Sequence, residues 1–395
     1  MTEYLNAAET YRDQVTQFLR EIIKLPSPSC EEKAVAERVV AEMGVLGYDE
    51  AFIDPMGNAV GRVGNGALRM VLDAHMDTVG VGNSNAWPHD PFEGKLENDI
   101  VFGRGASDNK GALAAQVYAG HLLAERGLDG ADVSVFVVGT VMEEDCDGLA
   151  LGYVLKETVP GVSAVILGEC TNLDVYRGHR GRMEMKVVTT GISSHASAPD
   201  RGDNAVTHMA PIVLAIDSLN ERLADDSFLG KGTVAATKIE CDTASLNAIP
   251  DSCAIYLDRR LTAGETRASA LEQVQDLLSD GARVEVLTYA EPSHTGLVLE
   301  IDKYYPTWTL EADHPLVAAG LAAGEAALGH TPATSRWTFS TNGVSSAGEL
   351  GIPTIGFGPS EEKWAHTVLD QCPVDHLVAS IAYYAALPRA LEGLK

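Results

Sequence analysis

Histidine and carboxylate side chains recur in this sequence at the ends of apolar runs or in the turns that follow them. Ionised carboxylates that are crowded together repel one another and lose hydration, and divalent cations remove both costs. A mixture of histidine and carboxylate ligands suits zinc, with cobalt or manganese as substitutes. Five segments supply these side chains and contain His75, Asp108, the Glu143–Glu144 pair, Glu169 and His366. Taken together, they predict a centre of two divalent metal ions.

The residue types also divide the chemistry among themselves. Two metal ions that share a water molecule lower its pKa and polarise a carbonyl, and one carboxylate must bridge the ions. A separate carboxylate must move the proton of that water to the leaving nitrogen. Glu143 and Glu144 suit this division, one facing the metal ions and the other the water. Asp77, two residues after His75, is placed to hold the second N–H of the imidazole. The pattern predicts a two-metal amide hydrolase.

Apolar strands alternate with helical patterns on both sides of a central block of the chain. This alternation predicts an α/β domain with a mixed, mainly parallel sheet, formed by residues 1–180 and 297–395. Because the carboxyl ends of parallel strands form the ligand crevice, the metal residues should meet at one edge of the sheet. Among the predicted elements are a helix over 4–24, strands over 68–77 and 133–144, and a helix from 110 to 127.

The central block, 181–296, has a different texture. An alternating strand begins near Gly181, and a loop rich in Gly, Ser and Pro leads to a helix over 204–224. Strands over 233–240 and 252–260, a helix over 265–279 and a last strand follow. This β-α-β-β-α-β order predicts a ferredoxin-like α+β domain inserted into the first.

Composition excludes several classes of function. The net charge of −27 argues against nucleic acid as a partner. We find no run of about 18 apolar residues for a membrane span and no features of a signal peptide at the N-terminus. None of the six cysteines forms a CxxC pair, which argues against a structural zinc site built on cysteines. We expect a cytoplasmic protein that acts on a small molecule.

These residues resemble the motifs of the M20 family of metallopeptidases, which includes acetylornithine and succinyl-diaminopimelate deacylases, carboxypeptidase G and dipeptidases. The resemblance runs from about residue 15 to about residue 390 and is specific because many motifs occur in order. They are HMDTV at 75–79, DPF at 90–92, GRGASDNKG at 103–111, the Glu143–Glu144 pair, a lid motif with His195 and GDNA at 202–205, a motif with Asn247 and Arg260, and FGPSEEKWAHT at 357–367. The family implies a phosphorylase/hydrolase-like catalytic domain and a lid domain that dimerises.

The resemblance also implies a role for each matching residue. The first metal ion would bind His75, Asp108 and Glu169, and the second would bind Asp108, Glu144 and His366. Glu143 would be the general base, and Asp77 would orient His75. The peptide bond between Asp108 and Asn109 would be cis.

The remaining implied roles concern the substrate. His195 would stabilise the oxyanion from the lid of the other subunit of a homodimer. Arg260, with Asn247, would hold the substrate carboxylate, although Arg259 could serve instead. Three positions depart from the common family pattern, and we expect these departures to affect substrate specificity. We expect Asn342 to contact the substrate. The three positions are Cys170-Thr171, Asn342 and Leu369-Asp370.

Three functions remain compatible with the sequence. The first is hydrolysis of an amide bond in a small carboxylate-bearing substrate, either an N-acyl amino acid or a dipeptide. The second is hydrolysis of an N-carbamoyl amino acid, which would release ammonia and CO2. The third is a non-catalytic metal-binding scaffold, and the intact Glu143 and metal ligands count against it.

Overall fold

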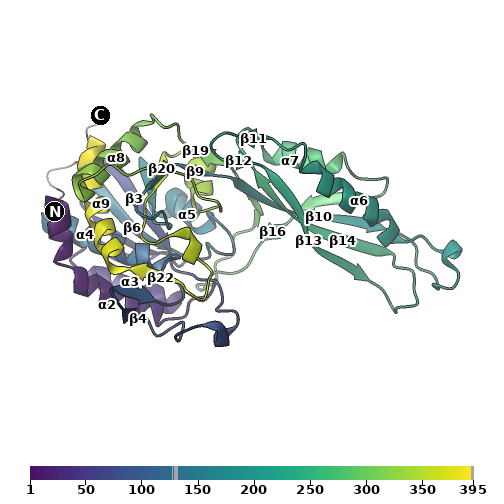
Figure 1. The fold of residues 1–395 in the computed structure, drawn as a ribbon, viewed down its shortest axis with the longest axis horizontal. Helices are drawn as coiled ribbons and strands as arrows, with labels where there is room; N and C mark the ends of the chain where they lie inside the picture. The colour runs from purple at the N-terminus through teal and green to yellow at the C-terminus, as the bar shows by residue number, and fades with distance from the viewer. Residues whose placement is uncertain (127, 129–131, 393–395) are drawn as a thin grey trace.

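The computed structural model describes residues 1–126, 128 and 132–392, which form two lobes (Figure 1). Both chain termini lie in the larger lobe, so the smaller lobe is an insertion (Figure 1). The larger lobe contains an eight-stranded sheet in the order β1-β2-β6-β3-β7-β21-β8-β20. These strands are β1 (Glu50–Ile53), β2 (Ala59–Val63), β3 (Leu68–His75), β6 (Val133–Thr140), β7 (Ala164–Leu167), β8 (Val175–Tyr176), β20 (Thr334–Ser335) and β21 (Thr354–Gly356).

The centre of this sheet is parallel, antiparallel pairs flank it on both sides, and the edge strand β20 pairs in parallel with β8. β3 pairs in parallel with β6 and β7, and β7 pairs in parallel with β21. β1, β2 and β6 pair antiparallel at one side, and β21 pairs antiparallel with β8 at the other. The predicted mixed, mainly parallel sheet is therefore confirmed.

Both faces of the large sheet are buried, as a parallel sheet requires. Along β6, Val135 and Val137 belong to one apolar core, whereas Phe136 and Val138 contact the other. This alternation follows from the two-residue period of a strand. The α-helices of the larger lobe are α1 (Glu3–Glu9), α2 (Arg12–Ile23), α3 (Lys33–Val45), α4 (Lys110–Arg126), α5 (Leu149–Tyr153), α8 (Pro315–Leu328) and α9 (Val374–Glu392).

One predicted element of the larger lobe needs correction, and one strand of that lobe was not predicted. The single helix expected over 4–24 is two helices, α1 and α2, because Tyr11 leaves helical geometry with φ −103° and ψ 4°. Strand β1 was not predicted, since its Glu-Ala-Phe-Ile sequence lies at the sheet edge and every side chain stays at least partly exposed. Neither difference moves a metal-site residue.

The smaller lobe is an antiparallel sheet with its own core. Its strands lie in the order β13-β14-β10-β15, with β18 also paired to β10. Met183, Met185 and Val187 of β10 belong to this core, together with residues of the helices. The order of the main elements is β-α-β-β-α-β, as predicted. The elements are β10 (Gly181–Thr190), α6 (Ala205–Leu219), β13 (Thr233–Asp242), β14 (Ser252–Leu261), α7 (Arg267–Gln275), β15 (Arg283–Val286) and β18 (Tyr304–Tyr305).

Short strands and helical turns connect the two lobes and complete each of them. β9 (Gly178–His179) pairs with β19 (Trp308–Thr309) where the chain leaves and re-enters the larger lobe. The other short strands are β4 (Lys95–Glu97), β5 (Ile100–Phe102), β11 (Asp225–Asp226), β12 (Gly230–Lys231), β16 (Thr288–Tyr289), β17 (Ile301–Asp302) and β22 (Gln371–Pro373). Single helical turns are η1 (Ser84–Ala86), η3 (Val154–Thr158), η4 (Pro199–Arg201), η5 (Val344–Glu349) and η6 (Glu362–Trp364). Within the described ranges, every helix is too short or too polar to cross a membrane.

Candidate metal centre

His75, Asp108 and Glu169 form a buried group at the carboxyl ends of β3 and β7. His75 ends β3, Glu169 follows β7, and Asp108 lies in the turn before α4. The Nε2 atom of His75 lies 2.8 Å from Asp108 Oδ1 and 3.6 Å from Glu169 Oε1. The three side chains are 1%, 8% and 4% exposed. We call these residues the inner triad.

Asp108 also belongs to a second group, with Glu144 and His366. The Nε2 atom of His366 lies 3.0 Å from Glu144 Oε2 and 3.3 Å from Asp108 Oδ2. Glu144 follows β6, and His366 lies in the loop after η6, where its side chain is 53% exposed. We call these residues the outer triad. Because Asp108 Oδ1 faces His75 and Oδ2 faces His366, this carboxylate has the geometry of a bridge between two ions.

The electrostatics of both triads favour added positive charge. Burial raises the pKa of Glu169 well above its ordinary value, and the Asp108 carboxylate adds to that rise. Against the effect of burial, hydrogen bonds from His366 and His75 lower the pKa of Asp108. The buried Oε2 of Glu169 has no hydrogen-bond partner among the described residues. For each triad, the ligand atoms lie within 4.8 Å of one another. The donor set therefore fits two divalent ions.

Asp77 lies beside His75, as expected, and its carboxylate has further partners. His75 Nδ1 is 2.9 Å from the backbone oxygen of Asp77 and 3.5 Å from its carboxylate Oδ1. The carboxylate also accepts hydrogen bonds from the backbone N–H groups of Glu143 and Glu144. It also accepts the hydroxyl of Ser29. Asp77 thus orients the imidazole through its carbonyl and the glutamate pair through its side chain.

Glu143 lies between the inner triad and an open cavity. Its Oε2 atom is 3.8 Å from Nε2 of His75, and its side chain is 7% exposed. The turn that holds it begins at Met142, which has a positive φ of 60° and donates its N–H to Glu32. Burial, with the nearby carboxylates Asp147 and Glu169, raises the pKa of Glu143 well above its ordinary value. A carboxyl group with a raised pKa suits a proton carrier at neutral pH.

The turn that carries Asp108 is fixed by a residue from the far end of the chain. The Asp108–Asn109 peptide bond is cis, which confirms that prediction. Asp370 is buried and accepts hydrogen bonds from the Gly105 and Ser107 N–H groups, the Ser107 hydroxyl and Arg104. The sequence predicts an effect of the Leu369-Asp370 departure on the substrate side. Asp370 instead supports the metal site, whereas Leu369 is exposed.

Two further departures also lie in the protein framework. Asn342 is buried and donates its amide to Asp73 and Thr140, while its oxygen accepts the N–H of Gly148. Both the amide N–H groups and the oxygen of Asn342 therefore already have hydrogen-bond partners within the protein. The expectation that Asn342 contacts the substrate is wrong. The thiol of Cys170 is buried and donates to the backbone oxygen of Ser107. Both residues fix segments around the metal centre.

The metal centre opens into a cavity of about 350 Å³. Arg260 lines this cavity, as expected, and forms two hydrogen bonds to Asp258 of 2.7 and 3.0 Å. Arg259 points to the opposite side of β14, where it is fully buried and bound to Glu265. Of the two arginines, Arg260 is thus the one that faces the site. The cavity is lined by Asp108, Glu143, Glu144, Asp147, Glu169, Arg182, Arg260, Phe339, Ser340, Glu362, Ala365 and His366.

His195 and Asn247 do not line this cavity. Both are exposed residues of the smaller lobe, and His195 pairs with Ala248 in an isolated bridge. Asn247 precedes β14, whereas Arg260 stands near the end of that strand. Within one chain, Asn247 and Arg260 therefore lie towards opposite ends of β14, and the expectation that they lie close together is wrong.

Several lining residues were not predicted from the sequence. Asp147 and Arg182 form an ion pair of 3.3 Å, and Ser340 donates its hydroxyl to Asp147. His179 is not among the lining residues; it accepts the indole N–H of Trp308, and burial lowers its pKa to about 4. The only sequence signal for these residues was the charge of the segments after Glu144 and before β10.

The fold and the site combine a mainly parallel sheet, two candidate metal-binding triads at its edge and an inserted smaller lobe. Residues 177–285 match the model of a peptidase dimerisation domain of the M20 type. The chain is 44% identical to the uncharacterized protein YgeY of Escherichia coli (strain K12), over 97% of this chain and 96% of that protein. It is 25% identical to a succinyl-diaminopimelate desuccinylase of Corynebacterium glutamicum, over 90% and 91% of the two chains.

A solved structure gives the same picture of the fold. The YXEP protein of Bacillus subtilis, described as a dinuclear metal binding peptidase from the M20 family, superposes with a TM-score of 0.70. The two are 15% identical, and the match covers 98% of this chain and 99% of that one. The chain belongs to the M20 family and is a hydrolase of amide or peptide bonds.

Proposed function

We propose that this chain hydrolyses an amide bond in a small substrate with a free carboxylate, either an N-acyl amino acid or a dipeptide. The observation that carries the proposal is the placement of Asp108, whose two oxygens face His75 and His366. The inner triad would hold one divalent ion and the outer triad the other. Zinc suits the donor set, with cobalt or manganese as substitutes.

The proposed reaction depends on the placement of Glu143. Two divalent ions, when bound, would lower the pKa of a water molecule and polarise the scissile carbonyl. Glu143 would accept a proton from the attacking water and donate it to the leaving nitrogen. Its backbone N–H is fixed by Asp77, which keeps the carboxyl group beside His75 and at the edge of the cavity. Asp77 and Asp370 act only by holding the residues around the metal centre in place.

The smaller lobe, which we take as residues 181–296, is proposed to act as a lid and as the contact between two copies. His195 and Asn247 are exposed and outside the cavity of their own chain. A homodimer would let His195 of one copy stabilise the oxyanion in the other. The matched dimerisation domain supports this arrangement. A cytoplasmic location remains a prediction.

The test uses Glu143→Ala with zinc-loaded protein and a panel of N-acyl amino acids, dipeptides and N-carbamoyl amino acids. Loss of the general base should lower kcat by about 100- to 10,000-fold. The zinc content, measured by elemental analysis, should stay unchanged. Undiminished activity in this variant would contradict the mechanism, and release of ammonia and CO2 would indicate the N-carbamoyl activity instead.

A further inference from the structure

The smaller lobe places two cysteines opposite each other on neighbouring antiparallel strands. Cys241 of β13 pairs in register with Cys253 of β14. Side chains that are directly opposite in a sheet project from the same face and interact with each other. Both cysteines are free. The distance between the two strands at this point decides whether the two thiols can join.

The alternation of hydrogen bonds in the sheet shows how close the two cysteines come. Where β10 and β14 meet the adjoining loops, the N–H of Gly191 donates to the oxygen of Asp251, 2.8 Å away. Hydrogen-bonded and non-hydrogen-bonded pairs alternate along an antiparallel ladder, so Cys253, two residues after Asp251, also bonds to β10. Its backbone groups therefore point away from β13, and Cys241 and Cys253 form a non-hydrogen-bonded pair. In such pairs the Cα atoms are only about 4.5 Å apart.

This spacing suits a disulfide bond. Disulfides join residues whose Cα atoms are about 4.4 to 6.8 Å apart and whose Cβ atoms are about 3.5 to 4.5 Å apart. Opposed Cβ atoms on neighbouring strands lie about 4.5 to 5.5 Å apart and are closer in non-hydrogen-bonded pairs. A small local movement of β13 toward β14 is therefore enough, and β13 is an edge strand of its sheet.

The two thiols differ in their access to solvent. Cys241 is exposed, whereas Cys253 is 1% exposed and belongs to the core of the smaller lobe. Burial and the nearby Cys241 raise the pKa of Cys253. An oxidant in solution therefore meets Cys241 first, and Cys253 is placed to react with the oxidised sulfur.

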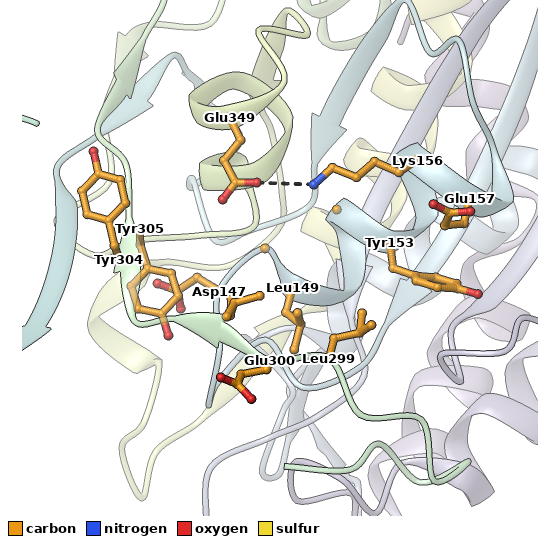
Figure 2. A pocket seen from close by; sticks show the side chains of 13 residues that line it. Asp147, Leu149, Tyr153, Lys156, Glu157, Leu299, Glu300, Tyr304, Tyr305 and Glu349 are labelled. Atoms are coloured by element: carbon orange, nitrogen blue, oxygen red, sulfur yellow. Dashed lines mark ion pairs between the residues drawn. The ribbon is translucent and has the colours of Figure 1, made fainter. Parts of the chain in front are cut away.

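The other four cysteines lie in the larger lobe and are less accessible than Cys241. Cys30 is half-buried. The buried ones are Cys146, Cys170 and Cys372. Cys146 accepts the hydroxyl of Tyr305, whose ring lines a cavity of about 370 Å³ between α5 and the segment that leads to β18 (Figure 2). Of the six cysteines, all of which the structure describes, Cys241 alone is exposed.

We propose that Cys241 and Cys253 form a reversible oxidation site in the smaller lobe, with a peroxide as the oxidant. The thiolate of Cys241 attacks hydrogen peroxide, which breaks the O–O bond and gives a sulfenic acid and hydroxide. The thiol of Cys253 then attacks that sulfur, so that an S–S bond forms and the S–O bond breaks with release of water. In total, two thiols and one hydrogen peroxide give one disulfide and two water molecules. A dithiol reductant reverses the oxidation by thiol–disulfide exchange.

The disulfide would close the loop formed by residues 242–252, which holds the segment of His195. In this loop the oxygen of Asn247 accepts the N–H of Ala196, and Ala248 forms a bridge with His195. Closing a loop at its base removes conformational freedom from it. Oxidation should therefore make the support of His195 more rigid. Only the meaning of this effect for catalysis rests on the proposed function, because the oxidation itself is independent of it.

The experiment treats the fully reduced protein with a limited amount of hydrogen peroxide, blocks the remaining thiols by alkylation and maps the disulfides by peptide mass spectrometry. We expect one disulfide, between Cys241 and Cys253, and a fall from six free thiols to four per chain. Dithiothreitol should restore all of them. Amide hydrogen exchange within 242–252 should be slower in the oxidised protein than in the reduced protein.

Single variants separate this pair from the other thiols. Cys241→Ala should prevent the disulfide, and because Cys241 is exposed, its replacement leaves the core of the lobe intact. In Cys253→Ala, dimedone should label the sulfenic acid of Cys241, which then has no thiol to consume it. Cys30→Ala is the matched control and should form the disulfide as the parent does.

Three results would overturn the inference. They are a parent that loses no thiols at Cys241 and Cys253, a disulfide that joins two copies through Cys241 and appears as a covalent dimer, and a disulfide that still forms in Cys241→Ala. None of these measurements uses hydrolytic activity. Failure of the proposed hydrolase function would therefore leave the oxidation result unchanged, and the two failures can be told apart.

Discussion

The inner and outer triads share Asp108 but differ in how the fold holds their other ligands. His75 ends β3, Glu169 follows the adjacent strand β7, and both side chains are almost fully buried. The outer triad combines Glu144 with His366, whose side chain is half exposed on a loop with a positive φ of 60°. The inner site is thus built by the core of the sheet, whereas the outer site depends on a loop.

This difference indicates how the two sites would bind metal. The inner ligands are ordered before an ion arrives, so little conformational freedom is lost on binding. For the outer site, the loop of His366 must be ordered and the imidazole must be neutral. We therefore expect the inner site to bind the more tightly of the two.

The largest effect should follow from Asp108→Ala, because Asp108 belongs to both triads. The variant should bind close to no zinc, as measured by elemental analysis after dialysis. If the ions contribute at least about 4 kcal/mol to transition-state stabilisation, kcat/KM should fall by about 1000-fold or more. A variant that retains both ions would remove the basis for a shared ligand.

Asp77→Asn should have a smaller effect, and one that falls on both triads. The substitution weakens the hydrogen bonds to the N–H groups of Glu143 and Glu144 but leaves the backbone oxygen that faces His75. Losses of about 10- to 100-fold in metal affinity or activity are typical for such supporting residues. Competition with a fluorescent chelator would measure the affinity. Unchanged affinity and activity would show that the side chain of Asp77 is dispensable.

The smallest expected effect is the change in metal affinity of the outer site with each unit of pH. Hydrogen bonds to Asp108 and Glu144 raise the pKa of His366 to about 10 in the metal-free protein. Below that pH the imidazole carries a proton that an incoming ion must displace, so affinity at the outer site should rise as pH rises. From His366 alone, the increase is about tenfold per pH unit between pH 6 and 9. Calorimetry in buffers of different ionisation enthalpy would count the released proton, and a pH-independent affinity would contradict the assignment.

The sequence predicted which candidate ligands would lie together because most of them stand at the end of a strand, in the turn after one or in a glycine-rich turn, whereas His366 lies in the loop after η6. Residues such as His75 and Glu169 are placed by strand order, which the apolar pattern reveals. The supporting contacts could not be predicted in the same way. Asp370 holds the turn of Asp108, and Asn342 reaches Asp73, through contacts between segments more than 260 residues apart. Such contacts depend on the final packing of the lobe.

Arg182 was missed for a related reason. Along β10 it alternates with buried methionines, in the same way as Glu184 and Lys186 of that strand. Its place in the cavity arises from the pairing of β10 with β14 and from the position of Asp147 in the other lobe. Neither relation is visible in the local sequence.

The central claim is a two-ion centre with unequal halves, and zinc titration of the metal-free protein by calorimetry tests it most directly. We predict two ions per chain in two separable steps. His366→Ala should remove only the weaker step, while His121→Ala, a partly exposed position on α4, should keep both. A single ion per chain in the parent protein, or two undiminished steps in His366→Ala, would contradict the account.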